Sequence, residues 1–263
     1  MKLYIPFAGP AAAEAALLAE DAGWEITKTK DAADFCLPVD EELRSLCCSK
    51  RAVNERLAAA GVPLPADFPE GSEPYLVKPD DGRNGQGIWT TADYCEVGGA
   101  VNAGFVTQEE RAGTLLSVAV RAGAAGVEIF PPVELLQDDR YCRIGARYPA
   151  DLSEEAERLL RSVVEAVAEA LRPTGFMEIK AVWGPAGLAV ISVNEGLPVL
   201  AASALWYGAG ISLVTDSTGA AAGSAVVRCY KNGSPCALRV LPNVPLRTEH
   251  RVEKGEHILD FSL

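Results

Sequence analysis

The stretch Leu76–Trp89, LVKPDDGRNGQGIW, decides how the fold is interpreted. A short apolar run ends in Lys78 and a proline, a polar loop follows, and a second apolar run begins at Ile88. The loop carries three glycines, Gly82, Gly85 and Gly87. Two interpretations are open: a glycine-rich hairpin turn with an exposed lysine, or a loop whose bare amides lie over phosphates.

Two familiar phosphate loops are excluded by what surrounds these glycines. A P-loop ends in Gly-Lys followed by Ser or Thr and leads into a helix, whereas no lysine follows Gly87. A dinucleotide fingerprint reads G-x-G-x-x-G before a helix, whereas this loop reads G-x-x-G-x-G before the strand-like Ile-Trp-Thr-Thr. The pattern predicts a strand–loop–strand flap, with Lys78 at the end of the first strand.

Periodicity and turn residues predict the remaining elements. The expected helices are Ala11–Ala22, the segment after Ser49 up to Gly61, Ser153–Leu171, and the segment after Pro198 up to Tyr207. The expected strands are Lys2–Phe7, Trp24–Thr29, Asp34–Leu37, Tyr75–Lys78, Gly87–Thr91, Gly104–Gln108, Leu115–Arg121, Val127–Leu136, Arg140–Ala146, Gly175–Val182 and Leu188–Val193. Two further β-like runs are AVVRCY at 225–230 and CALRVL at 236–241. This order predicts an α+β or α/β protein of several lobes.

Composition and charge limit the classes of ligand and partner that the protein is expected to bind. The 263 residues carry a formal net charge of −12 with scattered Lys and Arg, which argues against nucleic acid but permits a phosphorylated ligand in a locally basic cleft. No segment has the pattern of an export signal or a membrane span, so a soluble, cytoplasmic protein is expected. Seven cysteines without C-x-x-C spacing favour reduced thiols over a zinc site or a disulfide framework.

Four ordered motifs resemble the ATP-grasp superfamily over about Leu46 to Val214. They are a helix opened by Ser49-Lys50 and closed by GVPLP, then LVKPDDGRNGQG, then TQEERAGTLLSVAV, then GFMEIKAVWGPAGLAVISVNEGLP. The GVPLP and SVNEGLP stretches look most like small carboxylate–amine ligases of cofactor and amino-acid biosynthesis, of the methylornithine–lysine or tyramine–glutamate ligase type.

The resemblance implies an ATP-grasp fold, with two α+β lobes clamping ATP behind a reduced N-terminal α/β lobe. The implied units are 1–45 for the N-terminal lobe, 46–107 for the small lobe with its flap, and 108–263 for the large lobe. Lys50 and Lys78 would contact the phosphates, and the backbone of the hinge segment Gln108–Arg111 would contact the adenine edge. The implied nucleotide site comprises Lys50, Lys78, Gly82, Arg83, Asn84, Gly85, Gly87, Gln108, Glu109, Glu110 and Arg111.

The same resemblance implies magnesium on the hairpin, held by Glu178 and Asn194 with Glu195 filling in, because hard cations take oxygen ligands. The implied reaction joins a small-molecule carboxylate to an amine through an acyl phosphate, with ADP as product. Little covalent work falls to the protein, so charge and positioning carry catalysis. Lys78, Arg140 and either Arg143 or Arg147 could contribute that charge, and exposed arginines that merely balance an acidic protein are the alternative.

Several positions depart from the family pattern. Ser192 stands where the first metal carboxylate is usual, Phe176 stands where peptide-like ligases often have arginine, and Leu115 aligns with the ribose-binding acid. The first lobe is about half the usual size, so a homodimer partner could help to bind substrate. Three interpretations stay open: an active ligase, a nucleotide-binding partner or regulatory subunit without turnover, and a binding protein without nucleotide.

Overall fold

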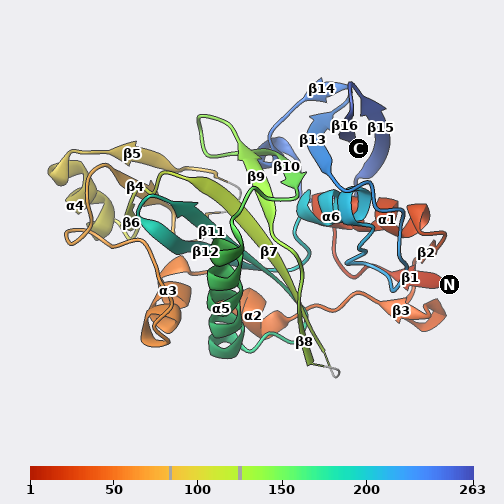
Figure 1. Cartoon of the computed structure of the whole chain (residues 1–263), viewed down its shortest axis with the longest axis horizontal. Helices are drawn as coiled ribbons and strands as arrows, with labels where there is room; N and C mark the ends of the chain where they lie inside the picture. The colour runs from red at the N-terminus through yellow and green to blue at the C-terminus, as the bar shows by residue number, and fades with distance from the viewer. Residues whose placement is uncertain (83–84, 124–125) are drawn as a thin grey trace.

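The computed structural model describes residues 1–82, 85–123 and 126–263, which form three β-sheets with helices packed around them (Figure 1). The mixed α+β fold class is confirmed. Among the described residues, no helix is long and apolar enough to cross a membrane.

The first sheet is parallel, with strand order β2-β1-β3, and helix α1 connects β1 to β2. Its elements are β1 (Lys2–Tyr4), α1 (Pro10–Asp21), β2 (Glu25–Thr27), the 3-10 turn η1 (Lys30–Ala32) and β3 (Phe35–Cys36). The expected strands and helix are present, although each strand is shorter than its apolar run suggested.

The second sheet is antiparallel, has the order β5-β4-β6, and carries the glycine loop between β4 and β5. Its strands are β4 (Tyr75–Lys78), β5 (Trp89–Thr91) and β6 (Val106–Glu109), and its helices are α3 (Lys50–Ala59) and α4 (Tyr94–Asn102). Ser49 caps α3 by accepting a hydrogen bond from the Ala52 N–H at 3.1 Å. The predicted strand–loop–strand arrangement is therefore confirmed.

The third sheet has the order β12-β11-β7-β9-β10-β13-β16-β15, with β8 paired to β7 and β14 paired to β13. Its strands are β7 (Thr114–Gly123), β8 (Gly126–Ile129), β9 (Val133–Gln137), β10 (Arg143–Tyr148), β11 (Phe176–Gly184), β12 (Gly187–Glu195), β13 (Ala225–Lys231), β14 (Ser234–Pro235), β15 (Arg247–Glu253) and β16 (Glu256–Ser262). The associated helices are α2 (Glu41–Leu46), α5 (Glu154–Leu171), α6 (Ala201–Ala209) and the 3-10 turn η2 (Leu238–Val240).

Strand alternation separates the two faces of this sheet. Met177, Ile179 and Ala181 of β11 belong to one hydrophobic core together with Leu160 and Val164 of α5. The intervening Glu178 and Lys180 therefore point to the other face, because successive strand residues alternate. Polar residues are thus placed on the face of the sheet away from α5.

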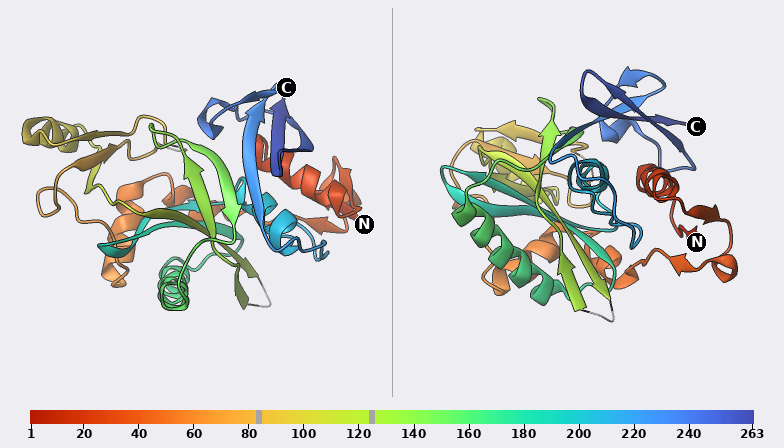
Figure 2. Two further views of the ribbon diagram at one scale, coloured as in Figure 1. Left: turned by 45° about the horizontal axis from the view of Figure 1, so that its top comes forward. Right: turned by 45° about the vertical axis from the view of Figure 1, so that its right-hand side comes forward.

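The N-terminal lobe packs against the C-terminal strands and α6. Both views of Figure 2 show the red lobe beside the blue strands, and Leu3 and Leu18 share a core with Leu259 and Phe261. Glu14 of α1 is completely buried, and its carboxylate accepts hydrogen bonds at the start of α6. The proposed units 1–45, 46–107 and 108–263 stay a prediction.

Several local predictions were wrong. The run Val127–Leu136 is two strands, since Pro131 and Pro132 interrupt the ladder. The expected strand at 140–146 begins only at Arg143, because Arg140 to Cys142 form a turn around the Asp138 carboxylate. The run CALRVL contains the turn η2, whose Leu238 is buried in the core. Helices α2 and α4 and the hairpin β15–β16 were not predicted.

Candidate active site

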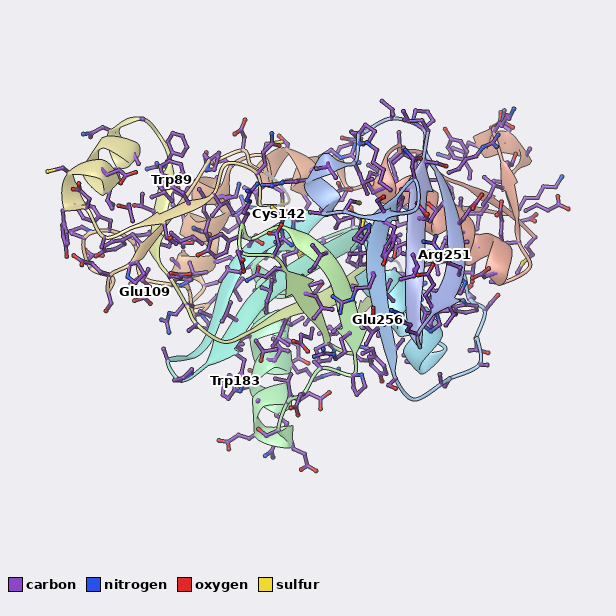
Figure 3. The ribbon with its side chains drawn as sticks, turned by 90° about the horizontal axis from the view of Figure 1, so that it is seen from above. Trp89, Glu109, Cys142, Trp183, Arg251 and Glu256 are labelled. Atoms are coloured by element: carbon purple, nitrogen blue, oxygen red, sulfur yellow. The ribbon has the colours of Figure 1, made fainter. Side chains whose placement is uncertain are left out.

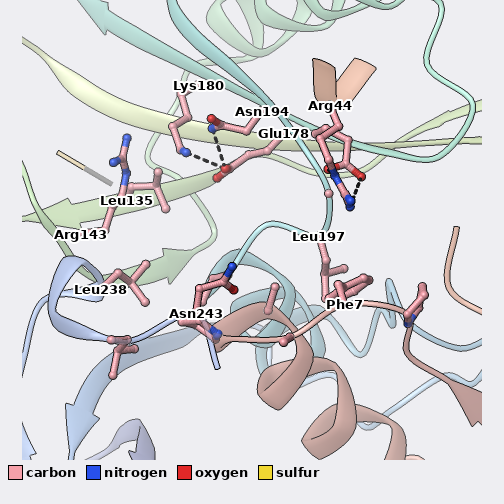
Figure 4. A pocket seen from close by; sticks show the side chains of 18 residues that line it. Phe7, Arg44, Leu135, Arg143, Glu178, Lys180, Asn194, Leu197, Leu238 and Asn243 are labelled. Carbon is pink, nitrogen blue, oxygen red and sulfur yellow. Dashed lines mark hydrogen bonds and ion pairs between the residues drawn. The ribbon is translucent and has the colours of Figure 1, made fainter. Parts of the chain in front are cut away.

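A row of polar side chains crosses the face of strands β7, β11 and β12 opposite α5. Glu178 lies opposite Asn194, and Lys180 lies opposite Ser192 in the strand register. The Glu178 carboxylate accepts from the Ser117 hydroxyl at 2.8 Å and from Asn194 Nδ2 at 3.3 Å. Lys180 Nζ lies 2.6 Å from Glu178 Oε2 (Figure 4). These groups form a connected buried network.

Burial and pairing shift the titration of this network. Burial alone would raise the pKa of Glu178, but the adjacent Lys180 ammonium and the Arg143 guanidinium hold that pKa below its usual range. Burial, assisted by Arg143, lowers the pKa of Lys180 to about 8, although Glu178 opposes the shift. Glu178 is therefore ionised at neutral pH, and its charge is balanced by an ammonium in direct contact.

Two more lysines approach from the small lobe. Lys78, at the end of β4, is buried, and its Nζ donates to Gln108 Oε1 at 3.0 Å. Burial, together with the nearby charges of Lys50 and Arg143, lowers the pKa of Lys78 to about 8. Lys50 opens α3, and its Nζ donates to the carbonyls of Pro79 at 2.8 Å, Asp80 at 2.9 Å and Gly82. Lys50 thus holds the beginning of the glycine loop.

The glycine loop is held against the turn before β10. Gly85 is buried and has a φ of +79°, and a Cβ there would overlap the carbonyl of Tyr141. Gly87 also has positive φ, and a Cβ there would press on Pro79. Gly82 and Gly85 line a narrow cavity with Lys78. The predicted site residues Arg83 and Asn84 lie outside the described residues.

The predicted adenine hinge, 108–111, runs from the end of β6 toward β7. Its side chains have partners within the protein: Glu109 accepts from the Ala66 and Ser72 N–H groups, Glu110 accepts from the Tyr141 hydroxyl at 2.5 Å, and Arg111 donates to the Ala186 carbonyl at 2.9 Å. An adenine at this segment would therefore meet backbone rather than these side chains.

Of the three predicted arginines, the structure brings Arg143 to the cavity. Its Nε is buried and finds no hydrogen-bond partner among the described residues, and its side chain lines both central cavities. The structure leaves Arg140 exposed in the turn before β10, and it pairs the exposed Arg147 with Glu134 at 2.7 Å. In Figure 3 this turn, marked by Cys142, lies between the small sheet and the C-terminal strands.

Glu195 sits beside the polar row but has a different partner. Its carboxylate accepts from Arg44 Nε at 3.0 Å and from the Asp40 N–H at 3.4 Å. The structure therefore directs Glu195 toward Arg44 and α2, whereas Glu178 and Asn194 contact each other directly.

Two adjoining cavities meet at this network. The narrow cavity lies under the glycine loop, and a larger one of about 570 Å³ opens toward the N-terminal lobe. Both are lined by Arg143, Lys180 and Asn194, which Figure 4 shows on one side of the larger cavity. A ligand in one cavity would therefore lie beside a ligand in the other.

Sequence reasoning missed three polar residues of the site: Lys180, Ser117 and Arg44. Lys180 could have been found, since it is two residues after Glu178 on a strand and must share its face. Ser117 comes from β7 and Arg44 from α2, so only the sheet order and helix packing bring them to Glu178 and Glu195. A single sequence carries no signal for those two contacts.

The donor set fits magnesium in part. Glu178 and Asn194 offer neighbouring side-chain oxygens, which suit a cation that keeps water and phosphate ligands. Among the described residues, however, no group of three or more His, Cys, Asp or Glu side chains gathers to hold a metal, and Lys180 contacts the same carboxylate. These residues fit an ion that takes most of its ligands from phosphates and water.

The chain is similar to two archaeal ligases. It is 28% identical over 184 residues to the 3-methyl-D-ornithine–L-lysine ligase of Methanosarcina acetivorans, covering 69% of this chain and 48% of that protein. It is also 28% identical over 183 residues to the ligase of the same name from Methanosarcina mazei, covering 68% and 47% of the two chains. The chain thus spans about half the length of the curated relatives it matches.

Solved structures share the fold. The L-amino acid ligase from Bacillus licheniformis superposes with a TM-score of 0.60 at 16% identity, covering 81% of this chain and 72% of that one. The biotin carboxylase from Campylobacter jejuni superposes with a TM-score of 0.59 at 13% identity, covering 75% and 66%. At such identities these likenesses concern the fold alone. The sequence model of the ATP-grasp domain matches residues 47–197, which is more than half of the chain. The chain therefore belongs to the ATP-grasp family.

Proposed function

We propose that this protein is an ATP-dependent, ADP-forming ligase that joins a small-molecule carboxylate to an amine. One observation carries the proposal: four cationic side chains from separate elements, Lys50, Lys78, Arg143 and Lys180, line one narrow cavity under the glycine loop. Burying cations without partners is costly, and a polyphosphate would supply several opposite charges in the same small space. The cluster therefore suits a polyphosphate ligand.

The proposed reaction has two steps. An oxygen of the substrate carboxylate attacks the γ-phosphorus, the bond from that phosphorus to the bridging oxygen breaks, and ADP leaves with the electron pair. The amine nitrogen then attacks the acyl carbon, the carbon–oxygen bond to phosphate breaks, inorganic phosphate departs, and a proton is lost from nitrogen. Negative charge develops on the departing ADP in the first step, and on the acyl oxygen and then the departing phosphate in the second, so preorganised cations stabilise both transition states.

The proposed roles follow the placement of each group. Lys78 and Lys50 would hold phosphates, and the backbone amides of Gly82, Gly85 and Gly87 would cover them. The backbone of 108–111 would meet adenine. Arg143, with its buried Nε, would hold the acyl phosphate in a forked contact, while Arg140 and Arg147 would stay outside. Glu178 and Asn194 would hold magnesium, which when bound would neutralise phosphate charge. Glu195 would form an ion pair with Arg44 and would not bind the metal.

Relatives and neighbours support the same activity. The two Methanosarcina relatives are named as ligases of amino acids, and one neighbour is an L-amino acid ligase. Other neighbours were crystallised with ATP or with magnesium ADP. The predicted cytoplasmic location and homodimer are part of this proposal, and light scattering during gel filtration tests the dimer.

Calorimetry and product trapping test the proposal. ATP titrated with magnesium should bind to the wild type, and Lys78→Ala should lose that binding because a buried ammonium facing the phosphates is removed. Hydroxylamine supplied as the amine should give a hydroxamate and ADP with the correct carboxylate. Absence of ATP binding with and without magnesium would contradict the nucleotide site. ATP binding without ADP release over a broad panel of carboxylates and amines would contradict turnover.

A further inference from the structure

The larger cavity has two unlike walls. One wall is polar and is formed by strands β10 to β12 and helix α2. The opposite wall is apolar and is formed by the segment after β1, the segment after β12 and the turn η2. Figure 4 shows Phe7, Leu197 and Leu238 facing the space from the side opposite Glu178 and Lys180.

The polar wall carries one more cationic side chain than it has carboxylates. The lining side chains include three cations, Arg44, Arg143 and Lys180, and two carboxylates, Glu178 and Glu195. Glu195 is paired with Arg44 at 3.0 Å and Glu178 with Lys180 at 2.6 Å. The remaining cation, Arg143, has a buried Nε without a hydrogen-bond partner among the described residues. This end of the cavity suits a single anionic group.

The apolar wall carries no charged side chain among the described residues that line the cavity. Its side chains are mostly apolar, namely Pro6, Phe7, Leu197, Val199, Leu238 and Leu241, and the neutral amide of Asn243 lies among them. A charged group placed against the apolar side chains would lose its water without gaining an oppositely charged partner, which is unfavourable. An apolar group would gain from the same contact, by roughly fourfold in affinity for each methylene buried.

We infer that this cavity takes the carboxylate substrate, and that this substrate is an acid with an apolar body. The inference rests on the proposed ligase function and adds the class of acid. The carboxylate would lie at Arg143, where the two cavities meet, and the apolar body would lie against Phe7 and Leu238. A volume of about 570 Å³ is within the usual range for small-molecule sites.

Binding of matched acids tests this inference apart from turnover. Two pairs have similar length but differ in their far end: leucine against glutamate, and 4-methylpentanoate against glutarate. Each acid is titrated by calorimetry into the wild-type protein saturated with magnesium and the non-hydrolysable analogue AMP-PNP. In at least one pair we expect the apolar member to bind ten times more tightly or better. Equal or reversed affinities in both pairs, or no binding of any of the four, would overturn the inference.

A hydroxylamine assay with ATP keeps the two proposals separate. Apolar acids that bind but give no hydroxamate would contradict the proposed ligase while the substrate class stands. Hydroxamate formed faster from glutamate and glutarate than from their apolar partners would overturn the substrate class while the ligase stands.

A cavity variant and a matched control locate the effect. Phe7→Ala removes a half-buried ring from the apolar wall, whereas Ile26→Ala trims an exposed apolar residue of the same lobe. We expect Phe7→Ala to weaken the preferred apolar acid at least fivefold and the matched acidic one less than twofold, with AMP-PNP affinity unchanged. Ile26→Ala should change none of these values. An equal change for both acids in Phe7→Ala would overturn the placement of the apolar body.

Discussion

Lys78 combines burial with positive neighbours, and this makes its charge sensitive to pH. Its pKa is lowered to about 8 by burial, Lys50 and Arg143, while Asp67 opposes the shift. The ammonium of the free protein therefore loses its proton as the pH rises through about 8. We expect nucleotide affinity to fall between pH 7 and pH 9.5, with proton uptake on binding above pH 8. Calorimetry in buffers of different ionisation enthalpy measures both.

Two substitutions at Lys78 give the controls. Lys78→Met should weaken nucleotide binding roughly 10- to 100-fold, the usual range for losing a charge-assisted contact. Lys78→Arg keeps a charge that does not titrate, so its affinity should fall less between pH 7 and pH 9.5 than that of the wild type. Since Lys180 also has a pKa of about 8, some pH dependence should remain. A Lys78→Arg profile identical to the wild type would exclude Lys78 as the titrating group.

We expect Ser192 to limit how strongly the proposed site holds magnesium. It lies opposite Lys180 in the strand register, on the same face as Glu178. Ser192→Glu adds a second carboxylate to the donor set, so we expect the magnesium concentration for half-maximal nucleotide binding to fall several-fold. Ser192→Gln has nearly the same size without the charge and should need as much magnesium as the wild type. Equal magnesium requirements for the Glu and Gln variants would show that position 192 does not face the ion.

At the scale of elements, the position of the glycine loop depends on the close approach of the Gly85 backbone to the Tyr141 carbonyl. Gly85 has positive φ, and any Cβ would overlap the Tyr141 carbonyl. Gly85→Ala should therefore move the flap off the turn before β10 and weaken nucleotide binding at least tenfold. Gly23→Ala is the matched control, because Gly23 has a similar φ of +78° and no atom within 4 Å of the added Cβ. It should cost only about 1 kcal/mol of stability, from the strain of a left-handed backbone, and leave affinity unchanged.

Helix α6 begins without a cap from its own chain segment, and Glu14 of α1 supplies one. The Glu14 carboxylate accepts from the Leu200 N–H at 2.9 Å and from the Ser203 N–H at 3.2 Å and hydroxyl at 2.6 Å. Glu14→Ala leaves buried donors without acceptors, so we expect a loss of about 2–3 kcal/mol in the free energy of unfolding. Urea unfolding measures it, and a loss below about 0.5 kcal/mol would contradict the capping role.

The Glu14 carboxyl also makes the stability of the fold depend on pH. Burial raises the pKa of Glu14 to about 7, although its hydrogen bonds to Ser203 and Leu200 oppose the shift. Between pH 4.5 and 7 the folded protein therefore binds more protons at this site than the unfolded chain. Its contribution to stability is complete below pH 4.5 and declines as the pH rises toward 7. Glu14→Gln, which does not titrate, should lack this decline.

Element prediction succeeded where the pattern is local. The apolar stripe of α5 and the Ser49 cap of α3 are written in adjacent residues, so both helices were found close to their observed ends. Helix α4 was not predicted because Gly98 and Gly99 weaken its helix propensity, although the Asp93 side chain caps its first turn. Strand β15 carries charged residues on a sheet edge, where apolar alternation is weak.

At the scale of the whole molecule, the site could be predicted only in part. Lys50, Lys78, Glu178 and Asn194 belong to ordered motifs, and the structure brings them to one region. The apolar wall comes from segments near residues 7, 197 and 240, which no local pattern connects. Its existence depends on the N-terminal lobe packing on the C-terminal strands. That contact is also why a lobe of roughly forty residues can persist, since so small a unit rarely buries enough surface alone.

Because the N-terminal lobe and strand β16 share one hydrophobic core, a destabilising substitution in β16 should also weaken acid binding in the larger cavity. Phe261 of β16 is fully buried in the core that also holds Leu3 and Leu18 of the N-terminal lobe. Phe261→Ala should cost about 3–5 kcal/mol of stability, the range for deleting a buried aromatic ring. We expect hydrogen exchange to show faster opening of β1 and β16 together, while β7 and β11 stay protected. The affinity of the preferred apolar acid should fall more than that of AMP-PNP, because Phe7 and Leu238 belong to the region that opens faster.

Leu160→Ala, in the separate core under α5, is the control: it should lower stability by about 2–5 kcal/mol without a selective increase of hydrogen exchange in β1. Equal loss of protection in β1 and β11 for Phe261→Ala would show that the lobe and the large sheet unfold as one unit.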